Sequence, residues 1–587
     1  MRWLREQAER RPDQSFLNGY SYKEIYNRAV LMAGFLDASV KHRSRVGVCS
    51  ENSVEMAVLL FALWLMGKEV FLVNPQLSVE ERMTQAIMLD VDLIYTSSQV
   101  QQRVVAEQET LDSDSLQTGK AHVCSLAGCV NAAVAQIRYD EKIVQWQTMP
   151  VLPLMAEQTV NSLVHCFESL LATGEGSAET PSDALAETPS DAPAEAICTV
   201  EIMNGFETSK PRFADKEIAD NRIAAIMSTS ATTGKMKAVP LRWGQIEAHV
   251  KASAQVLGRT DKDNWLIVLP MFHVSGLSIL MRTLYNGTAA TIHKGFDEET
   301  VLGAITSGKI NMVSLVPTVL QRIVNRISTH VLRVILLGGE FIPNALVETC
   351  IAKQLPIFKT YGMTETFAQS TTVDILKYPD KWKSVGRPLP GVTIEIRPFD
   401  VRSDEGINGE SNDESADELD YKPNDMLKLY NESSDESNDK LKGVSNDEPY
   451  GEIWLSSPML MTGYLGQPPL TGAFNTGDLG YVDDDGFLYV VNRRKDLIIS
   501  GGENIYPREI EDVLYEMPGI KECAVVPKSD AKWGQIPVLF YAGDAQEADV
   551  QEFLKARLGR YKQPKEIHKL DSLPRNSSGK ILRKDLK

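Results

Sequence analysis

The sequence predicts an α/β protein: a large N-terminal domain of doubly wound α/β subdomains with a small β-barrel-like subdomain, and a small α+β C-terminal domain. Three changes of pattern along the chain carry this prediction. Apolar strands alternate with amphipathic helices over residues 44–98 and again after residue 222, short strands with turns follow from about residue 380, and the pattern becomes mixed from Asp496. Strands that alternate with helices are typical of parallel sheets covered by helices.

The length and composition agree with this division. The chain has 587 residues, of which 43% are apolar and 24% are charged, as in ordinary globular proteins. The change of pattern at Asp496 predicts a large domain over residues 1–494 and a small domain over residues 495–587. A chain of this length buries a self-supporting core, so its seven cysteines are not needed as disulfide staples.

The cysteines and the apolar stretches favour a cytoplasmic protein. The cysteines are odd in number, scattered and without zinc-type spacing, as expected of reduced thiols. The polar start of the chain, MRWLREQAERRPDQ, argues against a secretory signal, and the apolar stretch at 57–67 is too short to span a bilayer. We therefore expect a cytoplasmic location and no membrane span, and a homo-oligomer stays open.

Two acidic segments account for nearly all of the negative charge. The formal net charge is -18, while residues 174–196 hold about six acids and no base, and residues 403–448 about fifteen acids and four bases. Both segments have too little apolar surface to offset the entropy of ordering, so we predict disordered, solvated insertions rather than interaction tails. The rest of the chain is close to neutral, which argues against a nucleic-acid partner.

The elements of the α/β part follow from apolar runs and a helix cap. Ser78 and Glu81 form a capping-box pattern, which predicts the start of a helix. An earlier helix is expected at 54–66. The expected strands are 44–50, 68–74, 92–98, 223–230, 264–270, 312–316, 333–339 and 355–362.

The elements of the C-terminal part are shorter. Strands expected at 392–398, 451–457 and 480–493 indicate a small antiparallel unit. A helix follows, with Pro507 near its first turn and Gly519 as its stop. Its apolar face consists of Ile510, Val513, Leu514 and Met517.

The first motif that can carry chemistry is STSATTGKMK at 228–237, between an apolar strand and an amphipathic helix. Small residues and a glycine permit a tight turn whose N–H groups and hydroxyls can face phosphate oxygens, and Lys235 and Lys237 can add charge. It is not a Walker A loop, because Thr229 replaces its first Gly and Met236 its Ser/Thr. A plain surface loop rich in Ser and Thr is an equally weighted alternative.

The second motif is YGMTET at 361–366, directly after the strand that begins at Leu355. A carboxylate just past a strand end in an α/β sheet lies where ligands bind, so Glu365 can hold a Mg²⁺ ion that bridges nucleotide phosphates. The alternative is a Thr and a Glu that cap the start of a helix.

The third motif is Thr476-Gly477-Asp478, followed by the basic run that begins at Arg493. An aspartate can accept both hydroxyls of a ribose, and an arginine can donate to the same diol. On its own, Gly-Asp is more often a simple turn.

The fourth motif is PRNSSGK at 574–580, near the C-terminus. Lys580 can be a mobile cation that is brought to a reaction centre. A solvated charge in a flexible segment is the more common occurrence.

Taken together, these blocks resemble the acyl-adenylate-forming superfamily, which includes acyl-CoA synthetases, adenylation domains and luciferases. The resemblance rests on TSATTGKMK, YGMTET, TGD, NRRKDLIISGGENIYP and PRNSSGKIL in this order, and it covers nearly the whole chain outside the two insertions. Within the superfamily, the segments 270–287 and 336–350 are most similar to the o-succinylbenzoate–CoA ligases of menaquinone biosynthesis.

The resemblance implies the roles of individual residues. Residues 229–237 hold the β- and γ-phosphates of ATP, Thr364 contacts the α-phosphate, and Glu365 holds Mg²⁺. The implied ATP- and AMP-binding residues are Thr229, Ser230, Thr232, Thr233, Gly234, Lys235, Lys237, Gly338, Gly339, Glu340, Tyr361, Gly362, Met363, Thr364, Asp478 and Arg493. Those implied for the acyl pocket are His273, Ser275 and Gly339.

The remaining implied roles concern catalysis and movement. Lys580, Glu365 and His273 are the implied catalytic residues, and Lys580 is the adenylation lysine. Lys495 falls at the hinge between the domains, and Gly501 and Gly502 line the tunnel for CoA. The phosphate loop departs from the family pattern at Ala231, Met236 and Ala238, where Gly, Pro and Gly are usual.

The implied reaction is ATP-dependent ligation of o-succinylbenzoate to CoA through an acyl-AMP intermediate. ATP, Mg²⁺, CoA and a small carboxylic acid are the implied cofactors and partners. Another acyl- or aryl-CoA ligase, or an adenylation enzyme that loads a carrier protein, carries the same motifs. A non-catalytic nucleotide-binding or scaffold protein is disfavoured, because Lys580 and Glu365 are both present.

Overall fold

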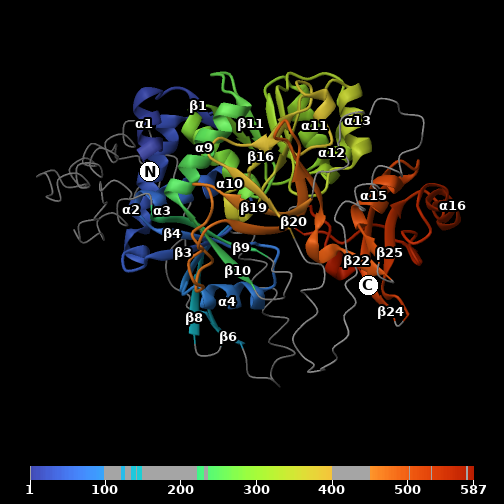
Figure 1. Ribbon diagram of the computed structural model, residues 1–587. Coiled ribbons are helices and arrows are strands. Elements are labelled where there is room, and N and C mark those ends of the chain that lie inside the picture. Colours follow the sequence, from blue (N-terminus) through green and yellow to red (C-terminus); the bar gives the residue numbers. More distant parts are fainter. Residues whose placement is uncertain are drawn as a thin grey trace, which may run out of the picture.

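Two large, mostly parallel sheets form the N-terminal part of the protein (Figure 1). The computed structural model describes residues 2–97, 121–125, 134–139, 142–148, 221–229, 236–398, 450–500, 503–530, 532–576 and 579–586. The predicted insertions at 174–196 and 403–448 lie outside the described residues. No helix in the described part of the chain has the length and apolar character needed to cross a membrane.

Sheet A contains nine described strands and carries most of the site. They are β1 (Ser15–Leu17), β2 (Tyr20–Ser21), β11 (Asn264–Ile267), β12 (Ala289–Ile292), β13 (Met312–Leu315), β14 (Val334–Leu337), β15 (Ile357–Tyr361), β16 (Thr371–Asp374) and β17 (Arg387–Pro388). Their spatial order is β17-β16-β15-β14-β13-β11-β12-β1-β2. Strand β11 lies between β12 and β13 and is parallel to both, so the chain order reverses there, which is where open α/β sheets bind ligands.

Sheet B contains eight described strands. They are β3 (Arg45–Cys49), β4 (Glu69–Leu72), β5 (Leu93–Thr96), β6 (Ala121–Ser125), β7 (Val134–Tyr139), β8 (Lys142–Thr148), β9 (Ile223–Thr229) and β10 (Lys237–Arg242). Their order is β10-β9-β4-β3-β5-β8-β7-β6. Strands β9, β4, β3, β5 and β8 are parallel to their neighbours in this run, whereas β10 is an antiparallel edge strand.

Helices cover both faces of both sheets, as the doubly wound prediction requires. The helices that share the core between the sheets are α1 (Arg2–Arg10), α2 (Tyr22–Val40), α3 (Val54–Leu65), α9 (Trp243–Leu257) and α10 (Val274–Asn286). The outer faces are covered by α4 (Val79–Met88), α11 (Glu298–Thr306), α12 (Pro317–Ile323) and α13 (Asn344–Ala352). In β11, Trp265 and Ile267 join one core and Leu266 the other, because successive side chains of a strand point to opposite faces.

Two smaller sheets follow. Sheet C is antiparallel and consists of β18 (Thr393–Arg397), β19 (Gly451–Ser456), β20 (Phe474–Val482) and β21 (Leu488–Arg493). Sheet D consists of β22 (Ile498–Ser500), β23 (Glu503–Ile505), β24 (Ile520–Asp530), β25 (Gly534–Gly543) and β26 (Glu566–Lys569). Helices α15 (Pro507–Tyr515) and α16 (Glu547–Arg557) pack with sheet D to form its own core.

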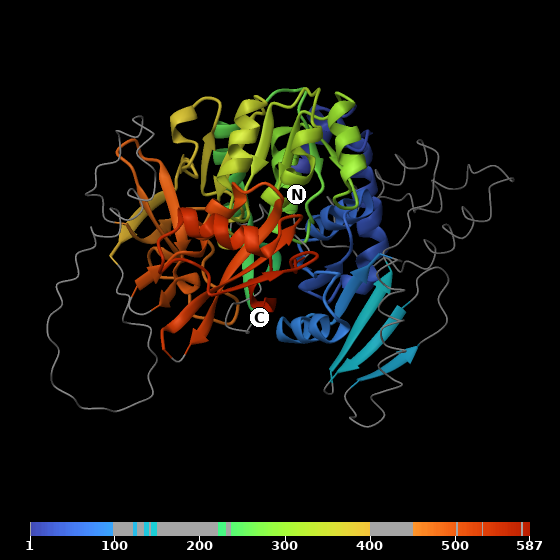
Figure 2. The same cartoon turned by 90° about the vertical axis from the view of Figure 1, so that its right-hand side faces the viewer.

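Five single-turn 3-10 helices complete the described elements. They are η1 (Val324–Arg326), η2 (Thr364–Thr366), η3 (Pro379–Lys381), η4 (Arg494–Asp496) and η5 (Arg583–Asp585). The predicted domain boundary between residues 494 and 495 falls in η4, which joins sheet C to sheet D. The C-terminal part lies against the large domain on the side of α12 and α13 (Figures 1 and 2).

Most predicted elements are confirmed, and the fold class is as expected. Each strand predicted from residue 44 to 98 and from 223 to 362 is present, and Ser78 caps α4 with Glu81 in a capping box. The predicted helix after Pro507 ends at Tyr515 rather than near Gly519, so Met517 lies beyond it. The N–H of Glu516 still bonds to Val513 and Leu514, but Met517 turns the chain towards Gly519, whose φ of 88° leads into β24.

The environment of the 228–237 segment differs from the prediction. The chain does not pass from this segment into a helix, because β10 intervenes and pairs with β9 from Thr229↔Lys237 onwards. Strands β9 and β10, on either side of residues 230–235, are therefore antiparallel neighbours, and helix α9 begins only at Trp243. Pro240 lies within β10, which is tolerated because β10 is an edge strand.

The backbone around the first turn of α10 leaves no room for a side chain at Gly276. A Cβ added to Gly276 would lie 2.3 Å from the carbonyl oxygen of Pro270 and 2.4 Å from that of Leu269. Gly276→Ala should therefore destabilise the protein by about 1–3 kcal/mol in urea unfolding, since the backbone must shift. Gly303→Ala, in α11 with nothing within 4 Å of the added Cβ, is the matched control and should be neutral or stabilising. Equal effects of the two variants would contradict this packing.

Candidate functional site

The candidate site lies at the carboxyl ends of three neighbouring parallel strands of sheet A. Strands β13, β14 and β15 are parallel and adjacent, so their carboxyl ends meet at one edge of the sheet. The chain that leaves this edge carries Thr318 in the first turn of α12, Glu340 in the loop after β14, and Glu365 in η2. Two of the predicted motifs, Gly338–Glu340 and Tyr361–Thr366, are therefore neighbours because of the strand order.

The predicted Asp478, Arg493 and Tyr361 form one hydrogen-bonded group. Asp478 on β20 pairs across the strands with Arg493 on β21, and the Nε of Arg493 lies 3.3 Å from Oδ1 of Asp478. The hydroxyl of Tyr361 donates to Oδ2 of Asp478 at 2.7 Å. This bond joins sheet C to sheet A, and Asp478 is buried, with 5% of its surface exposed.

Electrostatics hold this group in a defined protonation state. Burial and then the Asp478 carboxylate raise the pKa of Tyr361, so its hydroxyl remains a donor. Burial acts to lower the pKa of Arg493, but the carboxylates of Asp478 and Asp496 outweigh it and raise that pKa. The result is a buried carboxylate held by a phenol and a permanent cation.

Glu365 and Lys237 are connected through Tyr464, a residue that sequence reasoning missed. The hydroxyl of Tyr464 donates to Oε1 of Glu365 at 2.8 Å. The Nζ of Lys237, at the start of β10, lies 4.8 Å from the centre of the Tyr464 ring. The end of the predicted phosphate-binding motif and the predicted metal ligand thus contact the same side chain.

The segment after β15 turns tightly to bring Glu365 to this position. A Cβ on Gly362 would lie 1.5 Å from the carbonyl oxygen of Ala368, so only glycine fits there. Phe367 and Ala368 both have positive φ, at 53° and 92°, which costs about 1–3 kcal/mol for each non-glycine residue. Glu365 lies in the single turn η2, so it does not cap a longer helix as the alternative interpretation had it.

The C-terminal loop that carries Lys580 docks on the same edge of sheet A. The hydroxyl of Thr318 lies 2.9 Å from Oε1 of Glu340 and 3.4 Å from the carbonyl oxygen of Gly579. The loop is held by its own bonds, because the N–H of Lys580 donates to Oδ1 of Asn576 at 2.9 Å. Arg575 donates to the carbonyl of Gly579 at 2.6 Å and pairs with Glu522.

The charges around Lys580 show how the motifs converge. Burial, and then the positive charge of Arg493, lower the pKa of Lys580 to about 8, while the carboxylates of Glu340, Asp478 and Asp496 oppose this shift. Burial raises the pKa of Glu340, partly offset by Thr318, Arg575 and Lys580. Among the described residues the Lys580 ammonium forms no salt bridge, so its charge is available to a ligand.

A second set of contacts fixes the C-terminal part on the large domain. The N–H of Asn344 donates to Asp512 on α15 at 3.3 Å, and Arg508 donates to the carbonyl of Val490 at 3.0 Å. The Arg508 guanidinium also lies 5.3 Å from the Phe341 ring. Burial lowers the pKa of Lys495, in η4 beside this interface. These contacts hold Lys580 in the site.

Helix α10 begins after the carboxyl end of β11 with His273 and Ser275, and it carries Arg282 about two turns further along. His273 and Ser275 lie at its first turn, just after the carboxyl end of β11. Burial lowers the pKa of His273 to about 4, so the ring is neutral at physiological pH. It can exchange hydrogen bonds with an acid but does not supply positive charge.

Arg282 is a second residue that sequence reasoning missed. It is 2% exposed, and its guanidinium lies 3.1 Å from Ser278, 3.3 Å from His249 and 2.8 Å from Gln369. Within the described residues none of these partners is a carboxylate. Burial lowers the pKa of Arg282 to about 9, and its buried Nε has no hydrogen-bond partner among the described residues. Arg282 is the single charged residue in the run LSILMRTL at 277–284, and this is the signal in the sequence that could have found it.

Several predicted site residues lie outside the described part of the chain. They are Ser230, Ala231, Thr232, Thr233, Gly234, Lys235, Gly501 and Gly502. The first six follow Thr229, which ends β9, and precede Lys237, which begins β10. Gly501 and Gly502 follow Ser500, which ends β22, and precede Glu503, which begins β23. Gly338, Gly339, Met363 and Thr364 lie in the loops at the carboxyl edge of sheet A.

The described residues fit Mg²⁺ as a partner of bound phosphates. Oε2 of Glu365 has no hydrogen-bond donor among the described residues, and Tyr464 occupies only Oε1. The described part of the chain holds no cluster of three metal-ligating side chains. A single free carboxylate suits Mg²⁺, which is usually bound by one or two carboxylates together with substrate phosphates.

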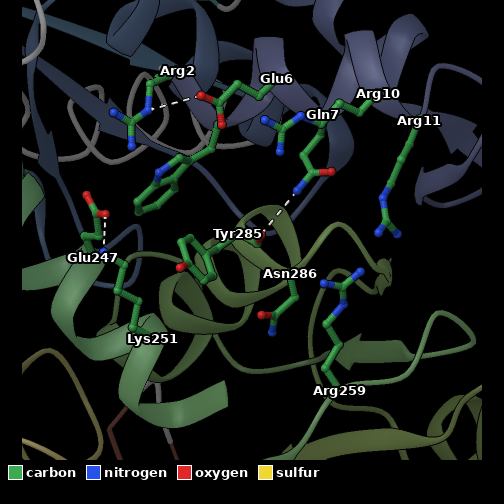
Figure 3. A pocket seen from close by; sticks show the side chains of 11 residues that line it. Arg2, Glu6, Gln7, Arg10, Arg11, Glu247, Lys251, Arg259, Tyr285 and Asn286 are labelled. Carbon is green, nitrogen blue, oxygen red and sulfur yellow. Dashed lines mark hydrogen bonds and ion pairs between the residues drawn. The ribbon is translucent and has the colours of Figure 1, made fainter. Parts of the chain in front are cut away.

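A hollow of about 420 Å³ lies elsewhere, between α1, α9 and the end of α10 (Figure 3). Its cations are largely paired: Arg2 with Glu6 at 3.3 Å and Lys251 with Glu247 at 2.7 Å. Arg11 and Arg259 share Asp261, each at 3.1 Å. None of the predicted site residues lines this hollow.

Comparison with known proteins shows which sequences the chain resembles. Residues 4–410 match the family model described as AMP-binding enzyme, and residues 509–580 match the AMP-binding enzyme C-terminal domain. The chain is 43% identical over 587 residues, all of both chains, to 2-succinylbenzoate–CoA ligase of Lactococcus lactis. It is 29% identical to the ligase of that name from Staphylococcus aureus strain MSSA476, over 100% of this chain and 99% of the other.

The chain is also similar to solved structures. The chain is similar to o-succinylbenzoate CoA synthetase from Bacillus subtilis in complex with the acyl-adenylate intermediate, with a TM-score of 0.70 and 28% identity over 100% of this chain and 97% of the other. The complex of that enzyme with ATP and magnesium gives a TM-score of 0.67 and 28% identity over 100% and 98%. By its sequence over the full length and by its fold, the chain belongs to the family of AMP-binding enzymes.

Proposed function

We propose that this protein ligates o-succinylbenzoate to CoA through an acyl-AMP intermediate, with release of pyrophosphate and AMP, in menaquinone biosynthesis. The observation that carries the proposal is the convergence of Lys580, Glu340, Asp478 and Glu365 at one edge of sheet A. The relatives that match over the full length carry the name of this ligase. ATP, Mg²⁺ and CoA are the cofactor and co-substrates.

Asp478 and Arg493 bind the ribose of ATP. The Asp478 carboxylate can accept hydroxyl hydrogens, and it is already oriented by Tyr361 at 2.7 Å and by Arg493 at 3.3 Å. Tyr361 lies beside the adenine, and Gly338, Gly339 and Glu340 complete the wall of the adenine and acyl pocket. The orientation of Asp478 before substrate arrives reduces the entropy lost on binding.

Residues 229–237, between β9 and β10, bind the β- and γ-phosphates. Lys237 adds a positive charge at the end of this segment, next to Tyr464. Thr364 contacts the α-phosphate, and Glu365 supplies the carboxylate for Mg²⁺. Bound Mg²⁺ neutralises negative charge on the phosphates.

In the first half-reaction, a carboxylate oxygen of the acid attacks the α-phosphorus of ATP. A new P–O bond forms, the bond to the β-phosphate oxygen breaks, and pyrophosphate leaves with the bonding electrons. The ammonium of Lys580 is held by its loop where negative charge develops at the α-phosphate. Preorganised charges of this kind are usually the largest contribution to catalysis.

The acid has two carboxylates, and only one reacts. The other needs a donor in the acyl pocket, and Arg282 supplies a buried cation with no carboxylate partner among the described residues. An unpaired buried cation is costly, and a substrate carboxylate would relieve that cost. His273 and Ser275 lie on the same helix and supply neutral hydrogen-bonding groups.

In the second half-reaction the C-terminal domain turns about Lys495. The turn withdraws Lys580 from the site and brings the segment with Gly501 and Gly502 to the site, where it lines the tunnel for CoA. The CoA thiolate attacks the acyl carbon, a thioester forms, and AMP leaves. Closure around each intermediate excludes water, which would hydrolyse acyl-AMP.

Substrate choice tests the function directly. With CoA and Mg²⁺-ATP, o-succinylbenzoate should release AMP at least about 30-fold more efficiently, in kcat/KM, than the analogue that lacks the second carboxylate, since a buried ionic contact is worth about 2–5 kcal/mol. Arg282→Gln should abolish this preference and leave the KM for ATP unchanged, while Arg282→Lys, which keeps the charge and the fold, should retain part of it. A wild type that activates both acids equally, or prefers a carrier protein to CoA, would refute the proposal.

Lys580 should act in one half-reaction only. Lys580→Ala should lower the rate of acid-dependent pyrophosphate exchange by about 10²–10³-fold, because the cation at the α-phosphate is lost. Thioester formation from supplied acyl-AMP should be largely retained, because Lys580 is then outside the site. Lys521→Ala, at an exposed surface pair with Asp544, is the matched control and should change neither rate. Equal loss in both half-reactions would contradict the two-state mechanism.

The lowered pKa of Lys580 predicts a pH dependence of adenylation. Its pKa of about 8 means that the ammonium loses its proton as the pH rises through 8. The rate of pyrophosphate exchange should therefore fall above pH 8, and the residual rate of Lys580→Ala should lack this limb. His273, with a pKa of about 4, should add no inflection between pH 5 and pH 8. A profile that stays flat to pH 10 in the wild type would contradict this assignment.

A further inference from the structure

Tyr464 lies where two distant parts of the chain meet. It belongs to the segment between β19 and β20, at residues 457–473. Its hydroxyl donates to Oε1 of Glu365 at 2.8 Å, and its ring centre lies 4.8 Å from Nζ of Lys237. One side chain therefore contacts both the carboxylate and the cation at the phosphate end of the site.

Backbone hydrogen bonds fix the position of Tyr464 on both sides. Three residues before it, the N–H of Met461 donates to the carbonyl oxygen of Glu365 at 2.8 Å. One residue after it, the N–H of Leu465 donates to the carbonyl oxygen of Ala238 on β10 at 2.9 Å. The short segment is thus bonded to η2 at one end and to β10 at the other, with the Tyr464 ring between these bonds.

The surroundings of Tyr464 hold its hydroxyl on one oxygen of Glu365. Its ring packs against the core cluster between the two large sheets. The hydroxyl donates to Oε1 of Glu365, while Oε2 has no donor among the described residues.

We infer that Tyr464 is a positioning residue for the metal–phosphate end of the site: its hydroxyl fixes Glu365 so that Oε2 faces the metal ion, and its ring places Lys237 beside the phosphates. The inference rests on the proposed function of Glu365 as the Mg²⁺ ligand and of Lys237 as a phosphate contact. Residues that orient a metal ligand typically change metal affinity or activity by about 10–100-fold when they are replaced.

Two substitutions separate the two contacts. Tyr464→Phe removes the hydroxyl and keeps the ring under Lys237. It should weaken the Mg²⁺-dependent part of ATP binding by about 10-fold or more and leave the affinity for ATP in EDTA unchanged. Tyr464→Leu removes the ring as well and should also weaken binding of ATP in EDTA, because Lys237 then loses its cation–π contact.

The experiment is titration calorimetry of the full-length protein with ATP, with Mg²⁺ or with EDTA, and it needs no acid substrate. Tyr22→Phe is the matched control, because it also removes a buried tyrosine hydroxyl, which donates to the carbonyls of Thr288 and Thr283 at 2.8 and 3.1 Å and not to Glu365. It should lower the melting temperature without changing the Mg²⁺ dependence. Pyrophosphate exchange at varied Mg²⁺ gives a second readout, in which Tyr464→Phe should raise the Mg²⁺ concentration for half-maximal rate.

Glu365→Gln separates failure of this inference from failure of the proposed metal site. It should remove the Mg²⁺ dependence of ATP binding. If Glu365→Gln removes it and Tyr464→Phe retains the wild-type dependence, Tyr464 does not position the carboxylate and the inference is overturned. If Glu365→Gln also retains it, the metal site itself is misassigned, and the inference falls with it.

Discussion

The adjacency of three parallel strands, β13, β14 and β15, is the constraint on which the rest of the site depends. Because these strands run in the same direction, the loops after them leave from one edge, and Thr318, Glu340 and Glu365 become neighbours. Strand β11, beside β13, adds the first turn of α10 with His273 and Ser275. A shift of one strand in this order would separate the groups that contact the nucleotide from those that contact the acid.

The remaining groups do not belong to sheet A. They belong to other parts of the chain that dock against its edge. Sheet C contributes Asp478 and Arg493, fixed to β15 through the hydroxyl of Tyr361, and the C-terminal domain contributes Lys580 through a loop that rests on Thr318. These attachments consist of hydrogen bonds and of the contacts of α13 with α15. A domain that has its own core and is held by such contacts can exchange one docked face for another, as a ligase with two half-reactions requires.

Sequence patterns predicted the elements well and the contacts between them only in part. The apolar runs of β9, β14 and β15 and the cap at Ser78 are local signals, so they were predictable from neighbouring residues alone. The strand β10 was not predicted, because Pro240 and flanking charged residues weaken its pattern and its pairing with β9 is set by the edge of the sheet. Tyr464 and Arg282 were missed for a different reason: their partners, Glu365 and Gln369, lie 99 and 87 residues away.

The central claim is that separate segments of the chain surround one ATP molecule. A crystal structure of the full-length protein with a non-hydrolysable ATP analogue and Mg²⁺ tests it most directly. The account predicts the ribose hydroxyls on Asp478, the metal on Oε2 of Glu365 and the ammonium of Lys580 at the α-phosphate. A nucleotide bound at another edge of the sheets, or one with Asp478 and Glu365 both out of contact with it, would contradict the account.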